Sequence, residues 1–169
     1  MKYTLNEFQN SSLRTAPFKG EPQNNEEKRD ILMNYTLGLS GEFIEFDLEN
    51  PNNYYGWLKE AGDVLHYAVV LMHILGIKTK DEQFGKVKVG NRNAYKSIMM
   101  ATETIKKTYY HGHEFDYEKF VSSVKNIIDH VYDKLGEYNF HLALELNIEK
   151  LKKRYPLGFS KEDSVNRKG

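Results

Sequence analysis

The stretch YYGWLKEAGDVLHYAVVLMHIL, residues 54–75, decides the fold. Its second half, from Val64 onward, is apolar nearly all the way round a helix, and such a helix belongs in the middle of a bundle. Gly76 follows directly and is well placed as a left-handed C-cap. We therefore expect a buried helix over residues 54–75, with the other helices packed around it.

The segment before this helix predicts a second one, over residues 26–49. Its broad apolar stripe consists of Ile31, Leu32, Tyr35, Leu39, Phe43, Phe46 and Leu48. The sequence NPNN at residues 50–53 is a strong stop and turn signal. Because the connection is short, we expect the two helices to be antiparallel neighbours.

The rest of the chain shows helical periodicity without the strict alternation that marks strands, so the predicted fold class is all-α. Further helices are expected over 4–14, 93–110, 117–136 and 138–154, with a loop over 16–25, a polar linker over 77–92 and an irregular tail over 156–169. The four prolines, at positions 17, 22, 51 and 156, all fall between these helices. Residues 1–169 are expected to form a single domain.

The composition excludes several classes of protein. Acidic and basic residues balance at 24 each, so no global charge attracts nucleic acid or a membrane. Cysteine is absent, which excludes disulfide scaffolds and cysteine-ligated zinc. No signal-peptide core and no stretch of 18 apolar residues occurs, so we expect a cytoplasmic protein.

Two pairs of carboxylates stand on the two central predicted helices. Glu42 and Glu45 are one turn apart, as are Glu60 and Asp63, and each pair points to one side of its helix. Counted outward from the turn at 50–53, the pairs lie at comparable heights. The four carboxylates are therefore expected to converge between the helices.

Such a cluster favours a divalent metal site, because like charges repel and partial burial adds to their free energy. Magnesium, or manganese in its place, prefers oxygen ligands and retains waters that suit a phosphate substrate. Gly38, Gly41 and Gly62 support this interpretation, since glycine inside a helix is unfavourable unless close approach requires it. Acid pairs at this spacing are also common on solvated helix faces, and spacing alone leaves both interpretations open.

At these residues the sequence resembles a known family. LGLSGEFIEF followed by KEAGDVLHY is similar to the E-x-x-E and E-x-x-D motifs of the MazG-like, all-α nucleoside triphosphate pyrophosphohydrolases. LNEFQNSSLRTAP resembles the family's first helix, and NIEKLKKRYPLGFSKEDSVNR its C-terminal signature. The resemblance covers most of the chain and implies a MazG-like helical bundle.

The resemblance also implies an activity, the magnesium-dependent hydrolysis of a (deoxy)nucleoside triphosphate to a monophosphate and pyrophosphate. The magnesium ligands and catalytic residues would be Glu42, Glu45, Glu60 and Asp63; the nucleotide-binding residues would be Tyr67, Asn147, Lys150 and Arg154, with Arg14 a weaker candidate. Lys150 and Arg154 are four positions apart, so both can face one polyphosphate. A solvated basic helix end is the other interpretation of these two residues.

One departure from the family suggests an internal repeat. Short members carry an H-G-H-E loop between their acidic motifs, whereas here it comes later, at residues 111–114. Aligning residues 93–155 on the family pattern gives a second, diverged hairpin, in which the acidic positions fall on Ser97, Met100, Ser123 and Asn126. The alternative is a simple insertion of two helices over 78–135.

Other interpretations stay open at this point. The chain could be a non-catalytic nucleotide-binding or regulatory protein, because the second hairpin lacks the acidic residues of the first. The D-x-x-H formed by Asp63 and His66 permits a di-iron carboxylate site, although no second E-x-x-H exists. His66 and His73 are better explained as core or near-site residues, and His111 and His113 as part of a turn. Both a self-sufficient monomer and a homodimer or larger homo-oligomer are compatible with the repeat.

Overall fold

The central element of the fold is α3 (Tyr54–Ile74), whose second half is almost entirely buried, as its apolar sequence predicts. The computed structural model describes residues 3–18 and 20–165, and this part of the chain contains helices and no strand. The predicted all-α class is therefore confirmed. No helix in the described ranges is long and apolar enough to cross a membrane.

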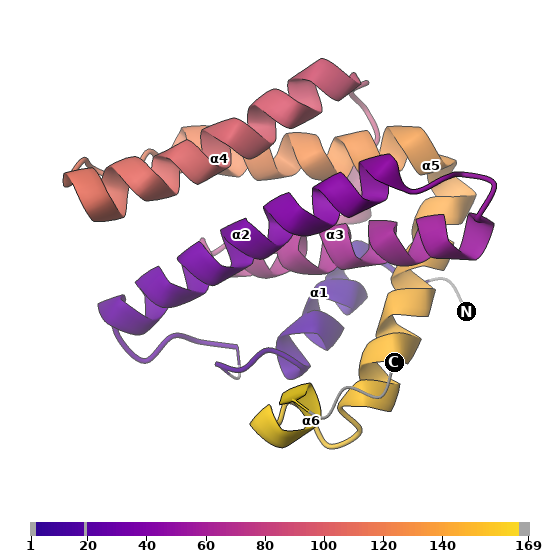
Figure 1. The fold of residues 1–169 in the computed structure, drawn as a ribbon, viewed down its shortest axis with the longest axis horizontal. Helices are drawn as coiled ribbons and strands as arrows, with labels where there is room; N and C mark the ends of the chain where they lie inside the picture. The colour runs from indigo at the N-terminus through magenta and orange to yellow at the C-terminus, as the bar shows by residue number, and fades with distance from the viewer. Residues whose placement is uncertain (1–2, 19, 166–169) are drawn as a thin grey trace.

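α2 (Asn25–Leu48) packs against α3 as its antiparallel partner, and the two are joined by the turn at residues 49–53 (Figure 1). Near this turn the rings of Phe46 and Trp57 stack, with centroids 6.0 Å apart. Gly76 has a φ of 80°, the left-handed conformation expected of a glycine that follows a helix. The predicted hairpin is present, with helix ends within one residue of those expected.

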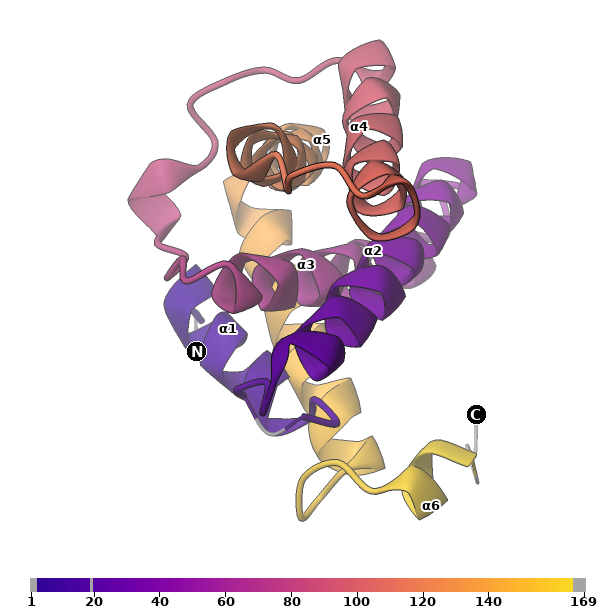
Figure 2. The same ribbon diagram turned by 90° about the vertical axis from the view of Figure 1, so that its left-hand side faces the viewer.

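α4 (Asn91–His111) and α5 (Tyr117–Arg154) form the rest of the bundle. α5 bends at Gly136, whose φ of 71° and ψ of 164° are not helical, where the sequence predicts two helices. Its first part lies beside α4, and its second part turns past α3 toward α6 (Figures 1 and 2). Gly112, with a φ of 70°, ends α4, so residues 111–114 form a helix end and turn, as expected.

Three smaller elements complete the structure: α1 (Leu5–Arg14), which packs against α3 and α5, the short 3-10 helix η1 (Asp81–Gln83) and α6 (Lys161–Val165). α6 corrects the expectation of a wholly irregular tail; Asn166 and Arg167 of the C-terminal signature lie outside the described residues. The segment expected to be a linker is anchored to the core: Thr79 donates its hydroxyl to the carbonyl of Leu5 at 3.2 Å, and Phe84 is buried.

Candidate metal and nucleotide site

Three carboxylates meet between α2 and α3. Glu42 comes from α2, Glu60 and Asp63 come from α3, and one oxygen of each lies within 4.8 Å of the other two. Among the residues that the structure describes, this is the group of three or more potential metal ligands whose ligand atoms lie this close together. Glu45 lies at its edge and is exposed to water, although its charge acts on both Glu42 and Glu60. Three of the four predicted ligands therefore form the group, with the fourth beside it.

Two glycines allow the close helix contacts around these carboxylates. A Cβ on Gly38 would overlap the ring of Tyr67 on α3. A Cβ on Gly62 would lie 2.9 Å from both the carbonyl oxygen of Ala143 and the Cβ of Asn147, on α5. Gly41 has open space around it, so the expectation of a close contact there is wrong within this chain.

The carboxylates raise one another's proton affinity. The pKa of Glu42 is raised to about 7, chiefly by burial and then by the charges of Asp63, Glu45 and Glu60. Burial and the charges of Asp63 and Glu45 raise the pKa of Glu60 as well. A cation between these groups would remove the repulsion, since negative charge is concentrated here in partly buried surroundings.

The second part of α5 supplies two polar partners for Asp63. The side-chain amide of Asn147 donates a 2.6 Å hydrogen bond to Asp63 Oδ1, and Lys150 forms an ion pair with the same oxygen. Asn147 is buried, and its own amide oxygen has no partner. Two residues predicted to bind nucleotide are thus placed directly against a predicted metal ligand.

A pocket of about 350 Å³ opens beside this group. Its lining consists of Thr15, Pro17, Asn34, Tyr35, Glu42, Asp63, His66, Tyr67, Lys150, Leu151, Arg154, Tyr155, Phe159 and Ser164. Of the predicted nucleotide-binding residues, Tyr67, Lys150 and Arg154 line it. Arg14 does not; its guanidinium instead donates to the carbonyl of Pro156 at 3.2 Å, so the structure does not support its predicted place in the pocket.

The sequence did not single out Asn34 or the role of Tyr35 in this pocket. The ring of Tyr35 lies 5.3 Å from that of Tyr67, at an angle of 60° between their planes. Asn34, Gly38 and Glu42 are spaced four residues apart and therefore share one face of α2. This spacing could have indicated that Asn34 lines the same pocket as Glu42. The aromatic residues Tyr155 and Phe159 come from the C-terminal segment, which carried no periodic signal.

His66 also lines the pocket, but it does not join the carboxylate group. Burial lowers its pKa to about 4, so the ring is neutral at physiological pH, and its Nδ1 has no hydrogen-bond partner. The described residues therefore offer no carboxylate–histidine pairing of the di-iron kind. His73 lies elsewhere, with its Nε2 2.8 Å from the carbonyl oxygen of Gly20.

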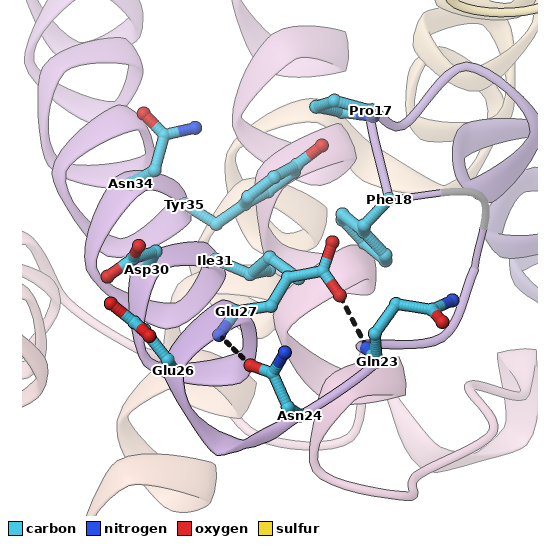
Figure 3. Close-up of a pocket in the computed structure, with 10 residues that line it drawn as sticks. All are labelled: Pro17, Phe18, Gln23, Asn24, Glu26, Glu27, Asp30, Ile31, Asn34 and Tyr35. Atoms are coloured by element: carbon cyan, nitrogen blue, oxygen red, sulfur yellow. Dashed lines mark hydrogen bonds between the residues drawn. The ribbon is translucent and has the colours of Figure 1, made fainter.

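A second pocket, of about 540 Å³, adjoins the first and shares Pro17, Asn34 and Tyr35 with it. Figure 3 shows its apolar side, formed by Phe18, Ile31 and Tyr35, and a polar rim to which Gln23, Asn24, Glu26, Glu27 and Asp30 contribute. The carboxylate of Glu27 accepts a hydrogen bond from the backbone of Gln23. Tyr35 therefore borders both spaces.

Comparison of the chain with protein-family models finds no match, and comparisons with curated proteins and with solved structures find none either.

Proposed function

We propose that the chain hydrolyses a (deoxy)nucleoside triphosphate to a monophosphate and pyrophosphate with the help of magnesium. The observation that carries this proposal is a single pocket that is lined by both acidic and basic side chains. Glu42 and Asp63 lie in it beside Lys150 and Arg154. A polyphosphate bound through a divalent cation needs both kinds of residue, because the acids hold the cation and the bases hold the phosphates.

The donor set suits magnesium. Glu42, Glu60 and Asp63 offer only hard oxygen ligands, and their ligand atoms are close enough to share one ion. Burial first and mutual repulsion second raise the pKa values of the two glutamates, and such an ion would favour their ionised forms. When bound, magnesium would supply Lewis-acid stabilisation of negative charge on the phosphates.

The remaining roles, which are proton transfer, stabilisation of charge and binding of the nucleoside, fall to side chains of the chain itself. Glu45, exposed at the edge of the carboxylate group, is assigned the role of accepting the proton of the attacking water. Lys150 and Arg154 stabilise charge that develops on the polyphosphate. The rings of Tyr35 and Tyr67, which meet at 5.3 Å, offer an apolar surface to the nucleoside.

Incubation with a panel of nucleotides and magnesium, following pyrophosphate release, tests the proposal. We expect turnover of at least one nucleotide and its loss in the Glu60→Gln variant. Absence of turnover with every nucleotide would contradict the proposal.

A second candidate is nucleotide binding without turnover. The ion pair between Lys150 and Asp63 favours it, because a lysine can serve as counter-ion to the carboxylates where a metal would otherwise be needed. Calorimetry separates the two candidates: saturable binding of a nucleotide, with no product formed on prolonged incubation, identifies the second.

A further inference from the structure

A third pocket, of about 310 Å³, lies on the α4–α5 side of the molecule. It is formed by the chain at residues 87–89, the beginning of α4 and the first part of α5. Its polar lining consists of Lys88, Asn93, Lys96, Ser97 and Asn126, with Met100 beside them. None of these residues belongs to the carboxylate group or to its pocket.

The charge of this pocket is entirely positive. No acidic residue lines it, and neither Lys88 nor Lys96 takes part in any of the ion pairs found among the described residues. The sequence around it, KVKVGNRNAYK at residues 86–96, contains four basic residues and no acidic one. In a chain with balanced charge, this concentration creates a local positive potential.

Neutral hydrogen-bonding groups line the pocket together with the two lysines. The amide nitrogen of Asn126 donates to the hydroxyl of Ser97 at 3.3 Å, and that hydroxyl donates to the carbonyl of Asn93 at 2.9 Å. Ser97 is buried, so the polar wall reaches below the surface. The side chains of Asn93 and Asn126 offer further amide N–H groups to a ligand.

The first turn of α4 adds to the positive potential. It contains Arg92 and no acidic residue, and no side chain caps its N-terminus. A basic residue at this end of a helix opposes the helix dipole, whereas an anion there is stabilised.

We propose that this pocket binds a small phosphate-bearing anion, held by Lys88 and Lys96 and hydrogen-bonded by the amides of Asn93 and Asn126. Ammonium groups and amide N–H donors together recognise phosphate oxygens. Ser97, Met100 and Asn126 are three of the positions predicted to correspond to the acids of the first hairpin. The pocket thus carries positive charge where the first hairpin carries negative charge.

The experiment is titration of the full chain with pyrophosphate by calorimetry, in EDTA so that no divalent cation is available to the carboxylates. We expect saturable binding that weakens about tenfold or more in the Lys88→Ala/Lys96→Ala variant. The Lys106→Ala/Lys134→Ala variant loses the same charge from exposed positions on α4 and α5 outside the pocket, and should bind like the wild type. Asn126→Ala should weaken binding without any change of charge.

The outcomes are distinguishable. Absence of saturable binding, or equal weakening in the Lys106→Ala/Lys134→Ala control, would overturn the proposal. Loss of binding in Lys150→Ala/Arg154→Ala, with Lys88→Ala/Lys96→Ala unaffected, would overturn it too, because the anion would then bind beside the carboxylates. Parallel titrations with orthophosphate and ADP show whether a free phosphate or a nucleotide is preferred. Tighter binding of a single-stranded oligonucleotide than of any of these would overturn the proposal in favour of nucleic acid.

Discussion

Glu42 and Glu45 lie three positions apart on α2, yet their surroundings differ. Glu42 is half-buried against α3, whereas Glu45 is exposed. Residues three apart on a helix differ by about 60° in direction, so only one of the two can point straight at the neighbouring helix. This difference is the reason why we propose a metal-holding role for Glu42 and a water-activating role for Glu45.

The two roles predict different effects of substitution. Glu60→Gln removes a carboxylate from the metal group, and we expect it to weaken magnesium binding by about tenfold or more. Glu45→Gln should leave magnesium affinity little changed while lowering kcat by about 100-fold, as expected for loss of a general base. Calorimetry with magnesium and steady-state kinetics measure the two effects. If Glu45→Gln lost metal affinity as strongly as Glu60→Gln, Glu45 would be a ligand.

The raised pKa of Glu42 predicts a pH dependence. Magnesium binds the ionised form, so affinity should rise as the pH increases from 6 through the pKa of about 7 and level off above it. The folded protein holds this proton more tightly than the unfolded chain does. Stability without metal should therefore fall as the pH rises from about 4.5 to about 7.

Calorimetry and thermal unfolding over this pH range test both expectations. Glu42→Gln cannot ionise at this position, so both pH dependences should become flatter. An unchanged profile in this variant would assign the titration to another group.

The sequence predicted the two acid pairs, because spacing on a helix follows directly from its geometry. It did not predict that Asn147 and Lys150 contact Asp63; the family resemblance singled these two out only as nucleotide-binding residues. The sequence also could not predict that Arg14 hydrogen-bonds to the carbonyl of Pro156, since that contact joins residues 142 positions apart. Asn34 was missed for the same reason: its importance depends on which distant segments close the pocket.

Among the helices, α3 and α5 approach closely at Gly62. A Cβ there would lie 2.9 Å from backbone and side-chain atoms of α5, including Asn147, which binds Asp63. Gly62→Ala should therefore destabilise the fold by about 1–3 kcal/mol and weaken magnesium binding by displacing Asn147. Urea unfolding and magnesium titration measure these effects.

Gly41→Ala is the matched control for this prediction. Gly41 is also inside a helix, but nothing within 4 Å would meet its Cβ. The substitution should stabilise the protein by up to about 1 kcal/mol through helix propensity alone. Destabilisation by Gly41→Ala would contradict this expectation, because no atom within 4 Å of the added Cβ could account for it.

Long helices were predictable as elements because apolar periodicity repeats over many turns. α6, with five residues, is too short to show helical periodicity, so it was not predicted. Residues 77–92 looked like a linker because they are polar and contain glycine. Their attachment through Thr79 and Phe84 depends on distant partners that composition does not reveal.

Metal binding should increase the free energy of unfolding of the whole molecule. A ligand that binds only the folded state at 100 times its Kd adds about 2.7 kcal/mol, which corresponds to a rise in Tm of roughly 5–10 °C for a chain of this size. We expect magnesium at this concentration to raise the Tm of Glu60→Gln by about half as much as that of the wild type or less, since a tenfold weaker Kd leaves about 1.4 kcal/mol of stabilisation. An equal rise in both proteins would mean that the ion binds elsewhere.

The all-α class and the α2–α3 hairpin could be predicted because they follow from local periodicity and a short turn, but the arrangement of the other helices could not. The bend at Gly136 directs the second part of α5 across α3, and no local sequence pattern predicts the direction of this bend. A repeat relation between the α2–α3 pair and the α4–α5 pair stays a prediction.

The bend at Gly136 also has a consequence for synthesis. Asp63 meets Asn147 and Lys150 across 84 and 87 positions of the sequence, so the site joins segments that are synthesised well apart in time. During translation the carboxylates of α2 and α3 emerge long before the residues of α5 that pair with them. The nascent chain therefore carries these carboxylates without their α5 partners until the second part of α5 has left the ribosome, and a divalent cation such as magnesium would offset their negative charge meanwhile.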